Sequence, residues 1–180
     1  HILFWAYNLI MEYCSKCGNK LILKESFNCG ISDGMVPFCT KCNEFRFPMF
    51  NSAVSSVIYN KDFSKTLLVQ QYGRGVNILV AGYVNKGETL EQALVREIKE
   101  ETGLCVISYQ FNASKYFEKS NSLICNFIVT TEDENLYPNS EIDFAKWYTI
   151  SEAGEEIYKN SLAEEFFLKS LGKISSMQIR

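Results

Sequence analysis

The sequence predicts an α/β fold in which a mixed β-sheet lies between two principal helices, preceded by a small metal-stabilised module. Apolar strand-like runs alternate with two capped helical segments after residue 50. Two C-x-x-C pairs, at 14–17 and 39–42, stand before these runs. The composition, 47% hydrophobic and 22% charged over 180 residues, is that of a globular protein with a sizeable core.

The clearest helical signal lies between Thr89 and Gly103. Thr89 with Gln92 three residues later forms a capping box, which predicts that a helix begins there. Gly103 stands where a left-handed residue would end it. The residues expected on one broad face are Leu90, Ala93, Leu94, Glu97, Ile98 and Glu101. This face therefore begins apolar and becomes acidic in its last turn.

The acidic end of this helix predicts a cation site. Glu97 and Glu101 are a like-charged i,i+4 pair with Glu100 beside them, and such pairs repel. The helix dipole also disfavours negative charge at a C-terminus. Hard divalent ions such as Mg²⁺ or Mn²⁺ prefer carboxylate oxygens and would relieve both effects. For three glutamates taken alone, a solvated helix end is the alternative interpretation.

The remaining elements complete a layered α/β/α arrangement. A hairpin loop is predicted at residues 60–65, and Gly73-Arg74-Gly75 forms a turn. A second helix is predicted to begin at Ser161, in a capping box with Glu164, and to end at Gly172. Strands are expected at residues 53–59, 66–71, 76–81, 105–111, 122–130 and 144–150.

The segment before the sheet contains four of the seven cysteines. Two C-x-x-C knuckles separated by 21 residues are typical of a tetrahedral Zn²⁺ site. Fewer than about 40 residues cannot sustain an apolar core alone, so the metal would supply most of the folding energy. Disulfides or a redox C-x-x-C are the alternatives. The expected zinc ligands are Cys14, Cys17, Cys39 and Cys42, and the expected buried apolar cysteines are Cys29, Cys105 and Cys125.

Charge and histidine content exclude several classes of function. A net charge of −3 and a pI near 5.3 argue against a general nucleic-acid surface. The only histidine is His1, which excludes a Ser-His-Asp triad and a histidine-ligated metal within the fold. Residues 1–10, before Met11, are interpreted as a leader or vector-derived segment, with a short strand or helix as the alternative. No targeting or membrane-spanning segment is evident, so a cytoplasmic location is expected.

Residues 82–104 resemble the Nudix box, G-x5-E-x7-R-E-U-x-E-E-x-G-U with U aliphatic. Ile98 and Leu104 occupy the two aliphatic positions. The fixed identities are matched by Gly82, Glu88, Arg96, Glu97, Glu100, Glu101 and Gly103. Seven identities at fixed spacing form a far more specific signal than most short motifs. The resemblance implies a Nudix α/β/α sandwich at residues 49–180, preceded by a zinc ribbon at residues 11–48.

The order of ribbon and Nudix domain is similar to that of the NADH pyrophosphatase branch. This resemblance implies metal-dependent hydrolysis of the pyrophosphate bond in a nucleoside diphosphate derivative, with NADH, NAD or ADP-ribose as candidate substrates. It also implies catalytic Mg²⁺ or Mn²⁺, structural Zn²⁺, a small-molecule nucleotide partner and a possible homodimer. A catalytically weak binding or regulatory module is the alternative hypothesis.

The resemblance also implies roles for individual residues. Glu97, Glu101 and Glu141 would bind the catalytic metal, and Glu100 would support it or polarise the attacking water. Glu141 enters this set through the branch's downstream E-x-x-x-A-x-W segment, which resembles residues 141–147. Gly82, Glu88, Arg96 and Gly103 would be structural residues of the box, with Arg96 paired to Glu88.

The branch's S-Q-P-W-P-F-P-Q-S segment lines up with Ser114 to Ser122. Only the end serines match, Phe117 takes the place of the tryptophan, and the prolines are missing. Tyr116, Phe117 and Ser122 are the candidate substrate-binding residues. The two aromatic rings would stack on a substrate ring, and core packing is their alternative role.

Overall fold

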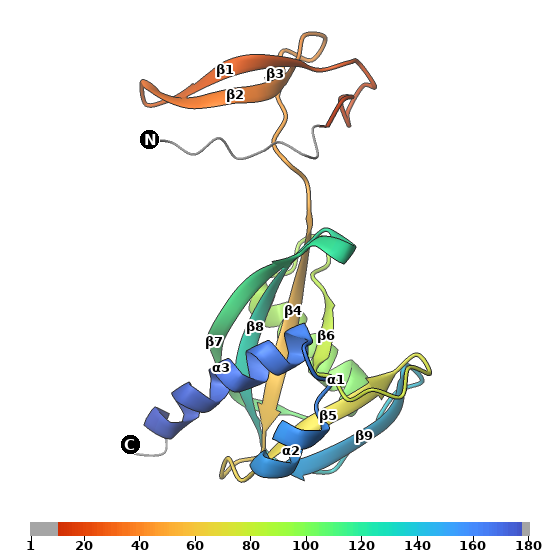
Figure 1. Cartoon of the computed structure of the whole chain (residues 1–180). Helices are drawn as coiled ribbons and strands as arrows, with labels where there is room; N and C mark the ends of the chain where they lie inside the picture. Colours follow the sequence, from red (N-terminus) through yellow and green to blue (C-terminus); the bar gives the residue numbers. More distant parts are fainter. Residues whose placement is uncertain (1–10, 178–180) are drawn as a thin grey trace. The chain divides into compact units, whose positions relative to one another are not determined.

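The computed structural model describes residues 11–177 and divides into two compact units between Met49 and Phe50. The first unit is a three-stranded antiparallel sheet of β1 (Ile22–Asn28), β2 (Ile31–Cys39) and β3 (Glu44–Phe45) (Figure 1). Its buried apolar residues are Cys14, Val36, Phe38 and Cys39. So small a core agrees with a unit whose stability comes from a metal.

The second unit is built on a six-stranded mixed sheet. Its order is β7-β8-β4-β5-β9, with β6 paired to β4 outside this path. The β4 and β8 strands run parallel, whereas the other pairs are antiparallel. The strands are β4 (Asn51–Tyr59), β5 (Lys65–Gln71), β6 (Val80–Tyr83), β7 (Val106–Phe117), β8 (Ser122–Thr131) and β9 (Ile142–Thr149).

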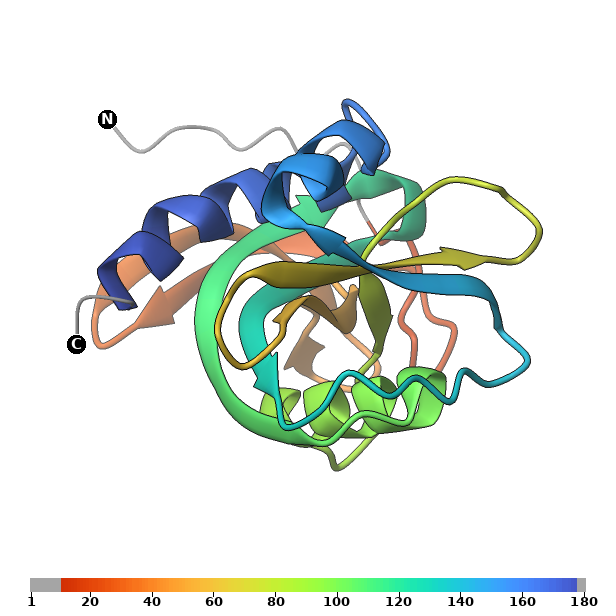
Figure 2. The same cartoon turned by 90° about the horizontal axis from the view of Figure 1, so that it is seen from below.

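Helices cover both faces of this sheet, as Figure 2 shows. One face packs against α1 (Leu90–Thr102), and the other against α2 (Ile150–Glu156) and α3 (Leu162–Met177). Side chains alternate along β4, where Val54 faces the α1 core and Val57 faces the α3 core. The predicted α/β/α sandwich is therefore confirmed.

Helix α1 begins and ends where the sequence predicts. The Thr89 hydroxyl accepts a hydrogen bond from the Gln92 amide, and the Gln92 side chain accepts one from the Thr89 amide. Gly103 ends the helix with φ 77°. A Cβ added at Gly103 would lie 2.8 Å from the Cβ of Tyr137, so both conformation and space require glycine there.

The strand predicted at residues 76–81 is displaced toward the C-terminus. Only Val80–Tyr83 forms β6, while Ile78 makes an isolated bridge to Val69. The cause is Asn77, which is buried and hydrogen-bonded through its side chain to Gln70 and to the carbonyl of Glu156. These bonds hold this part of the chain outside the continuous ladder.

The C-terminal helices also differ from the prediction. Helix α2 was not predicted, although Thr149 and Glu152 form a capping box at its start. Its seven residues follow β9 directly and show no long apolar period. Helix α3 continues past Gly172 to Met177. Ser161 accepts from the Glu164 amide as expected, but the Glu164 carboxylate accepts from the amide of Asn160 rather than that of Ser161.

Two of the three remaining cysteines are exposed, contrary to prediction. Cys29 lies at a turn with φ 50°, and Cys105 follows α1. Only Cys125 is buried, on β8 in the core under α1. The predicted leader at residues 1–10 lies outside the described residues. Within residues 11–177, none of the helices combines the length and the apolar character needed to cross a membrane.

Candidate active site

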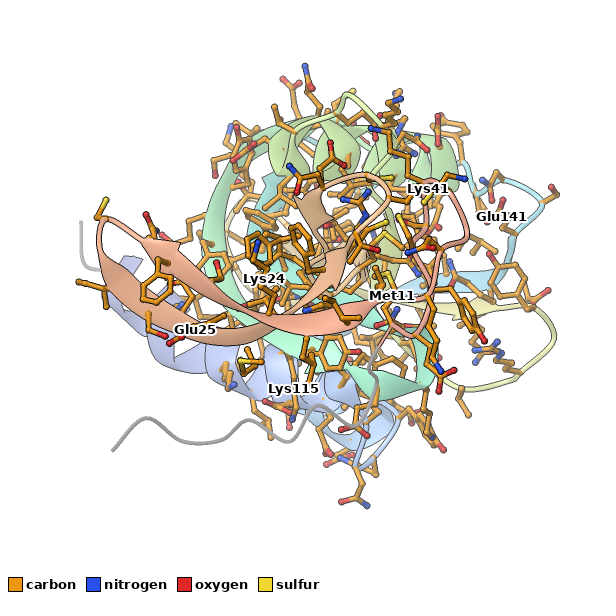
Figure 3. The ribbon with its side chains drawn as sticks, turned by 90° about the horizontal axis from the view of Figure 1, so that it is seen from above. Met11, Lys24, Glu25, Lys41, Lys115 and Glu141 are labelled. Atoms are coloured by element: carbon orange, nitrogen blue, oxygen red, sulfur yellow. The ribbon has the colours of Figure 1, made fainter. Side chains whose placement is uncertain are left out.

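The acidic end of α1 lies in a cleft of about 600 Å³. Glu97, Glu100 and Glu101 line this cleft together with Glu141. Figure 3 shows Glu141 on the segment that leads into β9, so its carboxylate comes from a different part of the fold. The cleft thus brings together the carboxylates predicted to be catalytic or metal-binding. Their oxygens are the donors that Mg²⁺ and Mn²⁺ prefer, so the chemistry of the lining, rather than a set of closely spaced ligand atoms, fits such an ion.

Glu101 has the most strongly perturbed environment of these acids. Its side chain is buried, and its Oε2 accepts a hydrogen bond from Nε2 of Gln71 at 2.9 Å. Burial, followed by the negative charges of Glu97 and Glu141, raises the pKa of Glu101 to about 7. A cation bound here would reverse both effects by stabilising the ionised form.

Arg96 ties the acidic face to the loop before the helix. Its Nε donates to Glu88 at 2.6 Å, which confirms the predicted pair, and its Nη2 donates to the carbonyl of Tyr83 at 3.1 Å. The sequence does not indicate that its Nη1 also donates to Glu97 at 2.6 Å and to Glu100 at 3.1 Å. Hydrogen bonding to Arg96 lowers the pKa of Glu88 to about 2. Arg96 therefore offsets the repulsion among three carboxylates.

Gly82 allows β6 to approach the acidic face of α1. A Cβ added at Gly82 would overlap the carboxylate group of Glu97. The backbone conformation is unremarkable, because Gly82 is not among the residues with positive φ. Here the glycine is required by space rather than by conformation.

The three residues predicted to bind substrate do not lie together. Phe117 and Ser122 line the cleft, but Tyr116 does not. Neighbouring residues of a strand point to opposite faces, and Tyr116 packs edge-to-face on Phe50 with its hydroxyl donating to Asn121 at 2.6 Å. The hydroxyl of Ser122 donates to the carbonyl of Ser120, so Ser122 shapes the turn that borders the cleft.

The end of β5 and the loop that follows it also contribute to the cleft, a contribution not predicted from the sequence. Gln71, Tyr72 and Arg74 all line the cleft, and the Tyr72 hydroxyl donates to Oε2 of Glu141 at 2.8 Å. The amide of Gly73 donates to the carboxylate of Asp143 at 2.6 Å, which fixes the loop against β9. In the sequence, the one indication of this contribution was the position of Arg74 between Gly73 and Gly75.

The four predicted zinc ligands lie together in the first unit. All four Sγ atoms fall within 4.8 Å of one another. Cys14 and Cys42 are 3.9 Å apart, and Cys17 and Cys39 are 3.5 Å apart. Tetrahedral zinc with Zn–S bonds of about 2.3 Å requires sulfur separations of roughly 3.8 Å. The described cysteines are free thiols rather than disulfides, so they fit a Cys₄ zinc site.

The NUDIX domain model matches residues 49–169, about two-thirds of the chain. The chain belongs to the Nudix family. Among solved structures, a NUDIX hydrolase from Nitrosomonas europaea has a TM-score of 0.66 at 22% identity and covers 93% of both chains. The NUDIX domain of Shewanella oneidensis NrtR, solved with ADP ribose, has a TM-score of 0.61 at 15% identity, covering 76% of this chain and 94% of that one. These structural similarities support the assignment of the Nudix fold.

Curated relatives are named NAD-capped RNA hydrolase NudC. The protein from Photobacterium profundum is 25% identical over 169 residues, which is 92% of this chain and 60% of the relative. The Vibrio vulnificus protein is 28% identical over 143 residues, covering 77% of this chain and 51% of the relative. The chain thus spans half to three-fifths of the length of these relatives. Together with the domain match, they agree with membership of the Nudix family.

Proposed function

We propose that this Nudix domain hydrolyses the pyrophosphate bond of a nucleoside diphosphate derivative with a divalent metal ion. Adenine dinucleotides such as NADH and NAD, or ADP-ribose, are the proposed substrates. The observation that carries the proposal is the gathering of four carboxylates in one cleft that also contains Phe117. A binding or regulatory module is the alternative, but such a module has no need for mutually repelling acids around a buried Glu101.

In this proposal Glu97, Glu101 and Glu141 hold Mg²⁺ or Mn²⁺. The bound metal would neutralise pyrophosphate oxygens and lower the pKa of a water molecule. Gln71 orients the carboxylate of Glu101 through the hydrogen bond described above. Glu100, more exposed than Glu101, supports the metal or polarises the attacking water. Hydrolysis would release a nucleoside monophosphate and a second phosphorylated product.

The substrate's ring would stack on Phe117. This residue lies at the end of β7, immediately before the turn formed by Glu118–Ser120, and it is partly exposed toward the cleft. Phenylalanine offers a smaller stacking surface than tryptophan, and the segment contains no proline to restrict its backbone. We therefore propose weak discrimination among dinucleotides.

The first unit is proposed to bind one structural Zn²⁺ through its four cysteines. Reduced thiols favour a cytoplasmic location, because disulfides are rare there. A homodimer is proposed from the resemblance to the NADH pyrophosphatase branch.

The names of the curated relatives introduce NAD-capped RNA as a second candidate substrate. Its cap carries the same pyrophosphate bond, so the same carboxylates would serve. A net charge of −3 provides little attraction for the RNA chain. We therefore propose that the cleft recognises the dinucleotide portion alone.

The decisive experiment compares kcat/KM for NADH, NAD⁺, ADP-ribose, NAD-capped RNA and a nucleoside triphosphate under one metal condition. The dinucleotides and ADP-ribose should be preferred, and Glu101→Gln should abolish turnover without unfolding the protein. A nucleoside triphosphate preferred by more than tenfold, about 1.4 kcal/mol, would contradict the substrate proposal. Metal-independent turnover, or full activity in the variant, would contradict the mechanism.

A further inference from the structure

A second cavity adjoins the metal cleft and has no role in the proposed mechanism. Its volume is about 360 Å³, within the range of small-ligand pockets. We call it the Tyr158 cavity; its lining residues are Gln71, Arg74, Val76, Ile78 and Tyr158. Gln71 and Arg74 also line the metal cleft, so the two spaces share a wall.

The chemistry of this lining suits a planar ring attached to a phosphate. Val76 and Ile78 provide an apolar surface, and Tyr158 provides an aromatic ring that is 52% exposed. Exposed aromatic rings beside apolar side chains are favourable surfaces for stacking a ligand ring. Arg74 adds a guanidinium group at the wall shared with the metal cleft.

Asn77 holds the walls of the Tyr158 cavity in place. Its Oδ1 accepts from Gln70 at 2.9 Å, and its Nδ2 donates to the carbonyl of Glu156 at 3.1 Å. Its own carbonyl accepts from the amide of Tyr158 at 2.8 Å. The buried Asn77 thus joins the β5–β6 loop to the segment after α2. A site held in this way is pre-organised, which reduces the entropy cost of binding.

Arg74 is available for an anionic ligand. Among the described residues that line the metal cleft, the basic side chains are those of Arg74 and Arg96. Arg96 is already paired with carboxylates, as described above. The guanidinium of Arg74 instead lies 5.8 Å from the centre of the Tyr72 ring and is exposed. A guanidinium in this position can donate two hydrogen bonds to a phosphate.

The two aromatic positions lie on different elements of the unit. Phe117 ends β7 and Tyr158 follows α2, and Figure 1 shows the turn after β7 and helix α2 at opposite ends of the second unit. A dinucleotide has two ring-bearing halves joined by a pyrophosphate. With one ring at Phe117 and the pyrophosphate at the carboxylates, the second ring needs a separate surface.

We propose that the Tyr158 cavity is the subsite for the second ring-bearing half of the substrate, a mononucleotide whose phosphate contacts Arg74. This inference rests on the proposed function and adds the location of the second half. The ring would lie against Tyr158 and the apolar wall. The lining therefore selects for a planar ring on the group that leaves with the second phosphate.

The test compares Tyr158→Ala with Tyr158→Phe and with Tyr109→Ala. Tyr109 is a matched control, because it is 45% exposed on β7 and lines neither cavity. The substrates are NAD⁺, which has two base rings, and an ADP methyl ester, in which a methyl group replaces the second nucleoside while the pyrophosphate is kept. Tyr158→Ala should raise KM for NAD⁺ about tenfold and raise it much less for the ester. Tyr158→Phe, which keeps the aromatic ring, should raise KM for NAD⁺ less than Tyr158→Ala does, and Tyr109→Ala should behave like the wild type.

Equal effects of Tyr158→Ala on both substrates, or no effect on either, would overturn the subsite. Arg74→Gln should instead raise KM for both substrates, because both carry the pyrophosphate. If the wild type hydrolyses neither compound, the proposed function fails and the subsite is judged by binding alone. In that case nicotinamide mononucleotide should perturb the NMR signals of Tyr158 in the wild-type protein. Unperturbed signals would overturn the inference.

Discussion

Glu101 lies among groups that oppose its ionisation. Its pKa is raised to about 7 by burial and by the charges of Glu97 and Glu141. In an unfolded chain a glutamate ionises near its ordinary pKa of 4.5. Between these values the folded state binds the additional proton, so the contribution of Glu101 to stability falls as pH rises. The residue needed for the proposed metal thus destabilises the protein when no metal is bound.

We therefore predict that Glu101→Gln stabilises the protein in buffer without Mg²⁺ or Mn²⁺, at high pH only. The variant should have a higher Tm than the wild type at pH 8 and nearly the same Tm at pH 5. Glutamine keeps an oxygen that can accept from Gln71, so the hydrogen bond is conserved. Thermal unfolding by circular dichroism would measure both values. A lower Tm at pH 8 would assign Glu101 a structural role instead.

Gly82 leads to a second prediction at the scale of single residues. Gly82→Ala should lower kcat/KM at least tenfold, because the new methyl group displaces the Glu97 carboxylate from its position beside Arg96. Gly154→Ala is the control. It lies within α2, where the nearest atom to an added Cβ is 3.9 Å away, so activity should be retained. Wild-type activity in Gly82→Ala would exclude a need for that position of Glu97.

At the scale of elements, Arg96 and Glu88 join the loop before α1 to the helix. The Glu88 carboxylate accepts from Arg96 at 2.6 Å and 2.8 Å and from the amide of Asn85 at 2.9 Å. Both side chains are largely buried, with 24% and 21% exposed. The loop that leads from Gly82 to α1 is thus held by this charged pair as well as by the packing of Val84 on the core.

Replacing Arg96 with methionine should lower the free energy of unfolding by about 1.5–3 kcal/mol, the range for hydrogen bonds to charged groups. Glu88→Gln should give a smaller loss, and urea unfolding of the double variant would isolate the coupling between the two. The wild-type pair should contribute fully above pH 4.5 and be lost as pH falls toward the Glu88 pKa of about 2. Additive effects of the two substitutions would show that the pair is not coupled.

The boundaries of α1 were predictable because local caps define both of its ends. Helix α1 ends at Gly103 because a left-handed residue is required there. Helix α3 instead continues past Gly172 to Met177, because Phe166 before this glycine and Ile174 after it both pack in the core. A glycine can therefore end a helix or lie within one, and the tertiary packing of the residues around it decides between the two.

At the scale of the whole molecule, the core clusters of the second unit include no residue of the first. Cys39→Ser should therefore abolish zinc binding and unfold residues 11–49 while leaving the second unit folded. Elemental analysis should show loss of one zinc per chain, and limited proteolysis should leave a fragment beginning near Phe50. Cys29→Ser is the control, because Cys29 is exposed and outside the four-cysteine group. Loss of both units together would show that their folding is coupled.

The sequence by itself determined the layered fold, the acidic row on α1 and the four-cysteine group. Each of these depends on spacing along the chain: a helical period, a pair of caps, or two C-x-x-C knuckles. Only the tertiary structure decided which other side chains complete the site. Glu101 meets Gln71 across 30 positions, and Tyr72 meets Glu141 across 69. The separation of Phe117 from Tyr116 likewise followed from the face of β7 that the sheet buries, because strand pairing, not local sequence, determines what each face meets.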